Sequence, residues 1–201
     1  MHQRKAVEQL FEDEKIIIWD TEYTSWPGCQ ENGWDNEKGE YREIIQIGAV
    51  KFDTSRLEVL DSFDKAISPQ INPQLSDYIK DLTGLSQKRI DEADKVETVL
   101  KAFNEWSQDL RLYSYGNDLD VVQRNIELYD SEIDLEDRRF KDVRKKFLEI
   151  GVPVDDWNSG DIAHYFDSGK ELLRQHDAYN DSMNMAEAVK LMIKQNSSSP
   201  K

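Results

Sequence analysis

The sequence predicts a single α/β domain in which a mixed sheet is flanked by helices. Extended, β-branched runs open the chain, and alternating helical and extended segments follow them. This order is typical of a sheet with helices packed against it. A length of 201 residues suits one domain with a full hydrophobic core. Residues 15–194 show no internal repeat and no sign of a second domain.

Extended segments dominate the first third of the chain. Residues 1–14 are expected to be a leader, helical or loose, and residues 15–20 (KIIIWD) to be the first strand. The next two strands are predicted at 44–52 and 57–68, and the tight connector DTSR between them indicates antiparallel pairing. The intervening segment 25–41 is rich in Gly, Asn and Trp and is predicted to be a loop, and loops of this length are often functional.

Helical periodicity begins after residue 75. Apolar side chains recur at spacings of three and four between Val96 and Leu110, which predicts an amphipathic helix. Two further strands are predicted at 111–116 and 140–144, which brings the expected sheet to five strands. Helices are predicted at 118–129, from the end of the fifth strand to Ile150, and at 180–194, and residues 195–201 are expected to be a disordered tail.

The charge and the composition exclude several classes of protein. There are 41 acidic and 26 basic residues, a net charge of −15, which disfavours a polyanionic partner unless bound divalent metals supply positive charge. The single cysteine, Cys29, excludes an internal disulfide and a multi-thiolate zinc site. The longest apolar run, Ile16–Trp19, is far too short to span a membrane, and the N-terminus lacks the apolar core of a secretory signal. We therefore expect a soluble, cytoplasmic protein without a membrane partner.

The first candidate site residues are Asp20 and Glu22, at the end of the first strand. Side chains two apart on a strand point to the same face, so these carboxylates are expected to lie together. A carboxylate pair at the end of an apolar strand is costly unless a cation neutralises it. The alternative is two solvated acids at a strand end.

Helical phase distinguishes Asp118 from Asp120. Positions three, four, seven and eight residues after Asp118 are mostly apolar, whereas those after Asp120 are mostly polar. Asp118 is therefore expected to face the protein interior and to belong to the site. It could equally serve only as a helix N-cap.

The last candidates are His176 and Asp181. Asp181 heads an apolar stripe of the final helix, and His176 lies five residues earlier in a loop. Taken alone, Asp181 could simply favour the helix dipole, and a lone histidine is often an ordinary surface residue. Their combination with Asp20, Glu22 and Asp118, however, means that three separated segments each offer acids to one sheet edge.

At these positions the chain resembles the DEDDh 3′–5′ exonucleases. The resemblance covers about residues 15–194. The family includes ribonuclease T, the proofreading epsilon subunit and the histone-mRNA-type exoribonucleases. Its most specific piece is the His-x-Ala-x-x-Asp element, here His176 and Asp181, and Trp26 looks like the tryptophan of the histone-mRNA-type branch. The matching motifs occur in the family's order: WDTE, EIIQIGAV, LTGL, GND and HDAYND.

The sequence departs from the family pattern at three places. Gln46 stands where the second-strand motif commonly has Glu, and Ser182 stands where an alanine usually follows the last acid. The GND element around Asp118 is compressed. None of these changes removes an expected catalytic group.

The resemblance implies an RNase H-like fold and a metal-dependent nuclease. Asp20, Glu22 and Asp181 would bind one divalent cation, Mg²⁺ or Mn²⁺. Asp20 would bridge to a second, on which Asp118 would act through water. His176 would be the general base, and the product would be a nucleoside 5′-monophosphate released from a single-stranded RNA or DNA 3′ end. The choice between RNA and DNA stays open, as does the oligomeric state, because relatives include monomers and homodimers.

Substrate contacts are expected near the first motif. Tyr23 and Trp26 could stack on terminal bases, or could serve only in packing. By resemblance, Thr21, Thr24 and Leu82 are also expected to contact the terminal nucleotides.

A basic patch near the predicted fifth strand could steer the substrate, or could be a solvated surface. It comprises Arg138, Arg139, Lys141, Arg144, Lys145 and Lys146. Two other functions remain open, namely a non-catalytic nucleic-acid-binding or polymerase-associated subunit of the same fold, and a metal-binding protein acting on small phosphorylated molecules.

Overall fold

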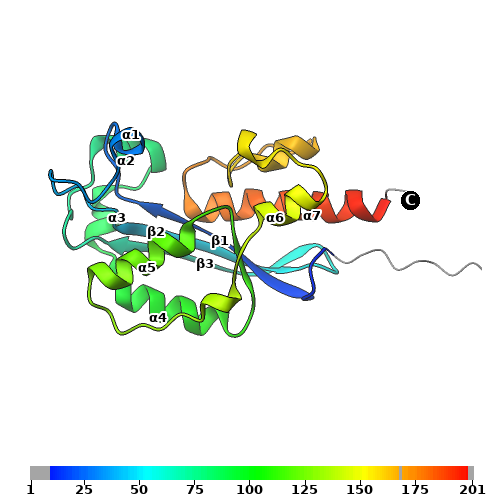
Figure 1. Cartoon of the computed structure of the whole chain (residues 1–201), viewed down its shortest axis with the longest axis horizontal. Coiled ribbons are helices and arrows are strands. Elements are labelled where there is room, and N and C mark those ends of the chain that lie inside the picture. The colour runs from blue at the N-terminus through cyan, green and yellow to red at the C-terminus, as the bar shows by residue number, and fades with distance from the viewer. Residues whose placement is uncertain (1–9, 168, 199–201) are drawn as a thin grey trace, which may run out of the picture.

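In the computed structural model, which describes residues 10–167 and 169–198, helices cover both faces of a mixed sheet (Figure 1). The strand order is β4-β3-β2-β1-β5-β6. The predicted fold class is confirmed, with six strands instead of five because the short β4 pairs with the end of β3. The strands are β1 (Lys15–Tyr23), β2 (Ile44–Asp53), β3 (Glu58–Ser68), β4 (Asp94–Lys95), β5 (Leu112–Ser114) and β6 (Phe140–Asp142).

Strand β1 is the centre of the sheet. It pairs antiparallel with β2 and parallel with β5, and β2 and β3 complete the expected antiparallel meander. Its pairing continues to Tyr23, three residues beyond the expected end, because Tyr23 still has a partner in Ile44. Asp20 and Glu22 therefore lie within the paired strand, opposite Gly48 and Gln46, so their backbone is fixed.

Helix α7 covers one face of the sheet, and α4 and α5 cover the other (Figure 1). Helices α2 and α3 were not predicted, since they are too short to show a helical period. The helices are α1 (Cys29–Asn32), α2 (Asp77–Thr83), α3 (Gln87–Asp91), α4 (Val96–Ser107), α5 (Asp118–Leu128), α6 (Arg144–Glu149) and α7 (Ala178–Ser198), with 3₁₀ turns at Asp137–Arg139, Val154–Asp156 and Ile162–Phe166.

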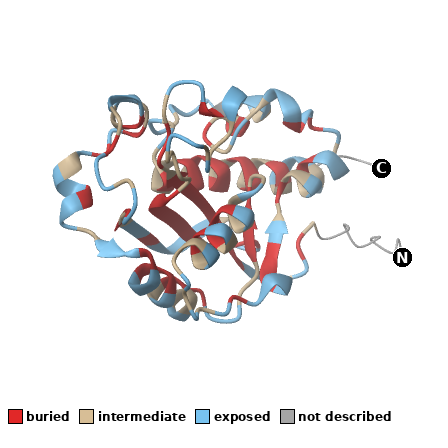
Figure 2. Cartoon of the chain, turned by 60° about the vertical axis from the view of Figure 1, so that its left-hand side comes forward, coloured by how far each residue is buried: buried red, intermediate tan, exposed pale blue. Residues whose placement is uncertain are grey.

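The core is divided between the two faces by the alternation of β1. Ile16 and Ile18 pack towards α7, whereas Ile17 and Trp19 pack towards α4 and α5. The central strands are consequently buried on both sides, while the helices keep an exposed outer surface (Figure 2). By the same alternation, Asp20 and Glu22 are directed to the face covered by α7.

Both ends of the described chain differ from the expectation. Phe11 is buried, and its ring packs edge-on against Tyr113 with centroids 5.1 Å apart, so the end of the leader is anchored. Residues 1–9 lie outside the described residues. Helix α7 extends past Lys194 to Ser198, and Ser197 Oγ donates to the carbonyl of Ile193 within it. The rest of the expected tail, residues 199–201, also lies outside the described residues. Among the helices that the structure describes, none is long and apolar enough to cross a membrane.

Candidate active site

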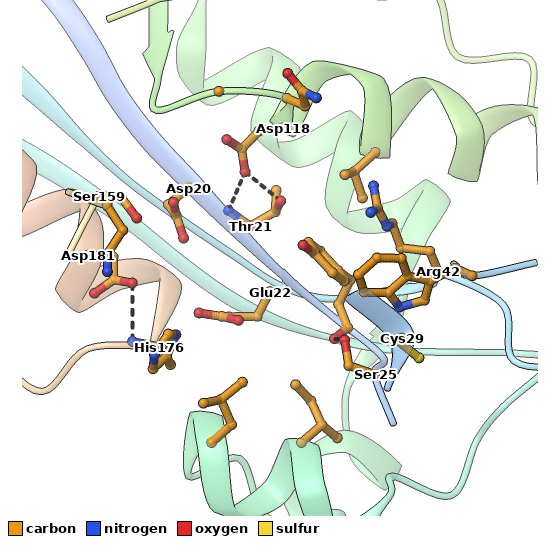
Figure 3. A pocket seen from close by; sticks show the side chains of 18 of the residues that line it. Asp20, Thr21, Glu22, Ser25, Cys29, Arg42, Asp118, Ser159, His176 and Asp181 are labelled. Atoms are coloured by element: carbon orange, nitrogen blue, oxygen red, sulfur yellow. Dashed lines mark hydrogen bonds between the residues drawn. The ribbon is translucent and has the colours of Figure 1, made fainter. Parts of the chain in front are cut away.

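A pocket of about 520 Å³ lies at the C-terminal end of β1 (Figure 3). Residues from β1, α2, α5, α7 and the loop between β1 and β2 meet there. The predicted site residues that line it are Asp20, Thr21, Glu22, Tyr23, Trp26, Leu82, Asp118, His176 and Asp181.

Strand β1 supplies two buried carboxylates. Asp20 and Glu22 are only 7% and 9% exposed. Burial and the neighbouring carboxylates raise the pKa of both groups well above the usual range, while a hydrogen bond from the Ser159 hydroxyl opposes this for Asp20. The fixed strand therefore holds negative charge in a place where it is costly.

Asp118, the first residue of α5, is hydrogen-bonded to the end of β1. Its Oδ1 accepts from the amide of Thr21 at 3.0 Å and from the Thr21 hydroxyl at 2.7 Å. Burial raises the pKa of Asp118 to about 6, although these hydrogen bonds lower it. Asp120 is exposed and does not line the pocket. The buried stripe of α5, which includes Val121, orients the helix so that Asp118 points inward.

Helix α7 begins in direct contact with β2. A Cβ on Gly48 would lie 2.1 Å from the amide nitrogen of Tyr179, so only a glycine allows this approach. The side-chain oxygen of Gln46 accepts from the amide of Ala178 at 3.1 Å, and its nitrogen donates to Asp177 at 3.2 Å. Gln46 and Gly48 thus position the first turn of α7 over the sheet.

Asp181 reaches the pocket from that first turn. Its Oδ2 accepts from the amide of His176 at 3.1 Å, and its Oδ1 is buried without a hydrogen-bond partner. Burial raises the pKa of Asp181 to about 7. The loop at Gly160 closes over this carboxylate, because a Cβ there would lie 2.5 Å from Oδ1.

His176 lies at the mouth of the site in a left-handed backbone conformation, with φ of 61°. Its ring is exposed, and one atom each of Glu22, His176 and Asp181 lie within 4.8 Å of one another. Partial burial and the nearby Arg174 lower the pKa of His176. The lowered pKa favours the neutral imidazole, which is the form that can accept a proton.

The residues present fit a divalent cation. Asp20, Glu22, Asp118 and Asp181 offer carboxylate oxygens, the donors that Mg²⁺ and Mn²⁺ prefer. The unpartnered Asp181 Oδ1 and the raised pKa values of these acids both indicate a place that lacks positive charge.

Thr24 was expected to contact substrate, but it lies outside the pocket. It is 1% exposed, and its hydroxyl donates to the carbonyl of Tyr41 at 2.6 Å and accepts from the amide of Glu43 at 2.9 Å. These bonds close the base of the loop between β1 and β2, which turns the side chain inward.

Five of the six residues of the basic patch line another pocket of about 760 Å³, in which five acids also lie, so the patch is a surface of mixed charge. Arg139 is buried and donates to Asn104 and Ser107, while Arg138 and Lys146 pair with acids close by in the chain. Of the six residues in the patch, Arg144 lines the pocket, and it is paired with Asp142 at 2.7 Å.

Sequence reasoning missed several residues that line the pocket. Ser159 is the middle residue of an Asn-Ser-Gly turn signal, which the sequence does not connect to β1. Trp34 comes from the predicted loop at 25–41 and Arg42 directly follows that loop, and composition gives no position for either side chain.

Comparisons with known proteins show which family the chain resembles. A family model described as exonuclease, RNase T, matches residues 17–189. Human 3′-5′ exoribonuclease 1 is 38% identical over 91 residues, which are 45% of this chain and 24% of that protein. The 3′-5′ exonuclease crn-4 of Caenorhabditis elegans is 26% identical over 171 residues, covering 75% of this chain and 56% of that protein.

A solved structure extends the similarity over nearly the whole chain. The nuclease domain of 3′hExo, described as a DEDDh family member bound to rAMP, has a TM-score of 0.77 and 26% identity. The match covers 90% of this chain and 92% of that domain.

Proposed function

The chain belongs to the DEDDh 3′–5′ exonuclease family, and we propose that it hydrolyses single-stranded nucleic acid from the 3′ end. The observation that carries this proposal is the meeting of Asp20, Glu22, Asp118, His176 and Asp181 in one pocket. A protein that only bound nucleic acid would have no use for a neutral imidazole beside buried carboxylates.

Two divalent cations, Mg²⁺ or Mn²⁺, would supply stabilisation of the attacking and leaving oxygens. Asp20, Glu22 and Asp181 would hold the first cation, with Asp20 also reaching the second. Asp118, fixed by Thr21, would act on the second through water.

His176 is proposed as the general base. Its ring nitrogen would take the proton from the attacking water, since its lowered pKa keeps the ring neutral near pH 7. The hydrogen bond that the His176 amide donates to Asp181 holds this residue beside the carboxylates. The product would be a nucleoside 5′-monophosphate.

The terminal nucleotide would lie between the first motif and α2. Tyr23 and Trp26 line one side of the pocket, and Leu82 lines it from α2. Aromatic side chains stack on bases of any identity, which suits processive removal of successive nucleotides. Thr21 lines the same pocket, although its amide and hydroxyl both donate to Asp118.

Relatives named as exoribonucleases favour RNA as the substrate of this chain. A cytoplasmic location and a homodimer stay predictions, and sedimentation of the purified protein would test the latter.

A gel assay tests the proposal. Matched single-stranded RNA and DNA, each labelled at the 5′ end, would be incubated with Mg²⁺, Mn²⁺ or EDTA. We expect metal-dependent ladders that shorten from the 3′ end, and their loss in Asp181→Asn. The proposal would be wrong if neither substrate were cut, or if EDTA left cleavage unchanged.

A further inference from the structure

Arg42 is a cation in the pocket wall that no carboxylate compensates. It is half-buried and lines the pocket, and its Nε is buried without a hydrogen-bond partner. Among the described residues, none forms an ion pair or a hydrogen bond with its side chain.

Of the other arginines near the pocket, Arg174 does not line it and donates to the carbonyls of Asp81 and Leu82, and two more are paired with acids. Arg144 lines the pocket but pairs with Asp142 at 2.7 Å, and Arg124 pairs with Asp35 at 3.1 Å. The formal charge of Arg144 is therefore offset, whereas that of Arg42 is available to a ligand.

Aromatic rings and backbone hydrogen bonds hold Arg42 in place. Its guanidinium carbon lies 4.1 Å from the ring centre of Trp34 and 4.7 Å from that of Tyr23. Its amide donates to Asp35 Oδ1 at 3.2 Å, and its carbonyl accepts from Asn125 at 2.9 Å. Aromatic contact over the guanidinium leaves its terminal N–H groups as the donors for a ligand.

Arg42 lies across the pocket from Asp181. Asp181 and His176 are at one side, Glu22 lies between, and Arg42 is at the other side (Figure 3). A strand that runs through the pocket from the carboxylates would thus bring a second segment of itself to Arg42.

We propose that Arg42 binds a phosphodiester of the strand on the 5′ side of the scissile bond. The inference rests on the proposed function and adds a contact to it. The nucleoside that leaves carries no phosphodiester beyond the scissile one, so a second phosphate must come from the strand that remains. A guanidinium with free terminal donors matches two oxygens of one phosphate, and a pocket rich in acids otherwise repels that group.

Binding at increasing salt concentration tests for this phosphate contact. The affinity of a fluorescent single-stranded oligonucleotide would be measured with Mg²⁺ in the Asp181→Asn background, where cleavage is expected to be blocked. Adding Arg42→Gln should weaken binding roughly ten-fold and should reduce the slope of log affinity against log salt by about 0.7. Arg42→Lys should keep the slope while weakening binding, because it keeps the charge and loses the fork.

Arg56→Gln is the matched control for net charge. Arg56 is exposed and lies in the β2–β3 turn, at the opposite end of β1 from the pocket. Arg56→Gln should leave both the affinity and the salt slope unchanged. An equal effect of Arg56→Gln and Arg42→Gln would overturn the proposal, because it would show a general field effect.

A set of oligonucleotides with one neutral methylphosphonate linkage each gives a second test in the same Asp181→Asn background. One linkage upstream of the scissile bond should weaken binding when neutralised, and this penalty should vanish in Arg42→Gln. If Arg42→Gln lowered affinity by an amount that depends on the base and left the salt slope unchanged, Arg42 would contact a base and the proposal would be overturned. The proposal would also be overturned if neutralising the linkage still weakened binding in Arg42→Gln. Failure of the wild-type chain to cut the unmodified oligonucleotide would instead contradict the proposed function.

Discussion

The four carboxylates of the site are held close together although each lacks a positively charged partner in the part of the chain that the structure describes. The carboxylates of Asp20, Glu22, Asp118 and Asp181 have no ion-pair partner among the described residues. Hydrogen bonds from Thr21 and from the amide of His176 orient two of them without neutralising them. Uncompensated buried carboxylates are what a divalent cation needs.

The two aspartates of the α5 first turn provide a matched pair for mutation. Asp118→Asn should lower cleavage roughly 100-fold or more, because it removes the negative charge that would help to hold the proposed second cation. Asp120→Asn makes the same chemical change on the exposed side of the helix and should leave the rate within about two-fold. Steady-state rates on one labelled oligonucleotide would settle the comparison, and the reverse order would place the wrong face of α5 in the site.

The hydrogen bonds of Gln46 explain why this chain has glutamine where the family commonly has glutamate. Its amide nitrogen donates to Asp64 at 2.9 Å and to Asp177 at 3.2 Å, so a glutamate there would face two acids without a donor. Gln46→Glu should lower the free energy of unfolding by about 1–3 kcal/mol at pH 8. The buried new carboxyl would have a raised pKa, so the defect should shrink on acidification to pH 4.

Denaturant unfolding at the two pH values measures this effect. Exposed Gln70→Glu adds the same charge and serves as the control. A Gln46→Glu variant as stable as the wild type at pH 8 would show that Gln46 does not hold the start of α7.

Among the secondary-structure elements, periodic ones were predictable and short ones were not. The helical stripe of α5 gives the direction of Asp118, and the alternation along β1 gives the common face of Asp20 and Glu22. Helices α2 and α3 depend on Ser76 and Ser86 caps and on tertiary packing, which a periodic pattern does not show. The inward direction of Thr24, which was expected to contact substrate, and the place of Arg42 in the pocket could not be predicted, because hydrogen bonds between distant segments fix the chain around them.

The contact between β2 and α7 makes Gly48 a structural requirement. Gly48→Ala should lower stability by roughly 1–3 kcal/mol, since its methyl group would meet the backbone of α7. It should also lower the cleavage rate, because a displaced first turn moves Asp181. Thermal melts and single-turnover rates together would show both losses.

Gly39→Ala is the comparison for that variant. Its backbone has a φ of 77°, but nothing lies within 4 Å of an added methyl group. It should cost some stability and leave the rate unchanged. A Gly48→Ala variant with full activity would contradict the positioning of Asp181 through this contact.

At the scale of the whole molecule, the net negative charge has to be reconciled with a nucleic-acid substrate, which is also negatively charged. The net charge of −15 does not favour nucleic acid, yet the fold concentrates acids at one pocket. Bound cations would reverse the local sign there and allow a polyanion to approach. The acidity of the chain is therefore compatible with a nuclease.

Stability should depend on pH and metal together. The pKa values of Asp118 and Asp181 are raised to about 6 and about 7. Acids with raised pKa values stabilise the fold fully below their unfolded pKa, and this stabilisation is lost as pH rises through the folded values. In EDTA, the melting temperature should therefore fall between pH 5 and pH 8.

Bound Mg²⁺ should restore the stability that is lost when the carboxylates of the site deprotonate. At pH 8, saturating Mg²⁺ should raise the melting temperature by about 5 °C, and at pH 5 by much less, because protons compete with the cation. An Asp181→Asn variant should show a smaller metal effect. Equal shifts at both pH values, or none, would argue against a cation site made of these carboxylates.

The most direct test of the central claim, that this chain is a metal-dependent 3′–5′ exonuclease, is the identity of the first product. A single-stranded oligonucleotide would carry a radioactive phosphate only in its last linkage. We predict that, with Mg²⁺ and not with EDTA, the label appears at once as a nucleoside 5′-monophosphate. A label that stays on the long strand, or first appears in a short oligomer, would contradict the claim.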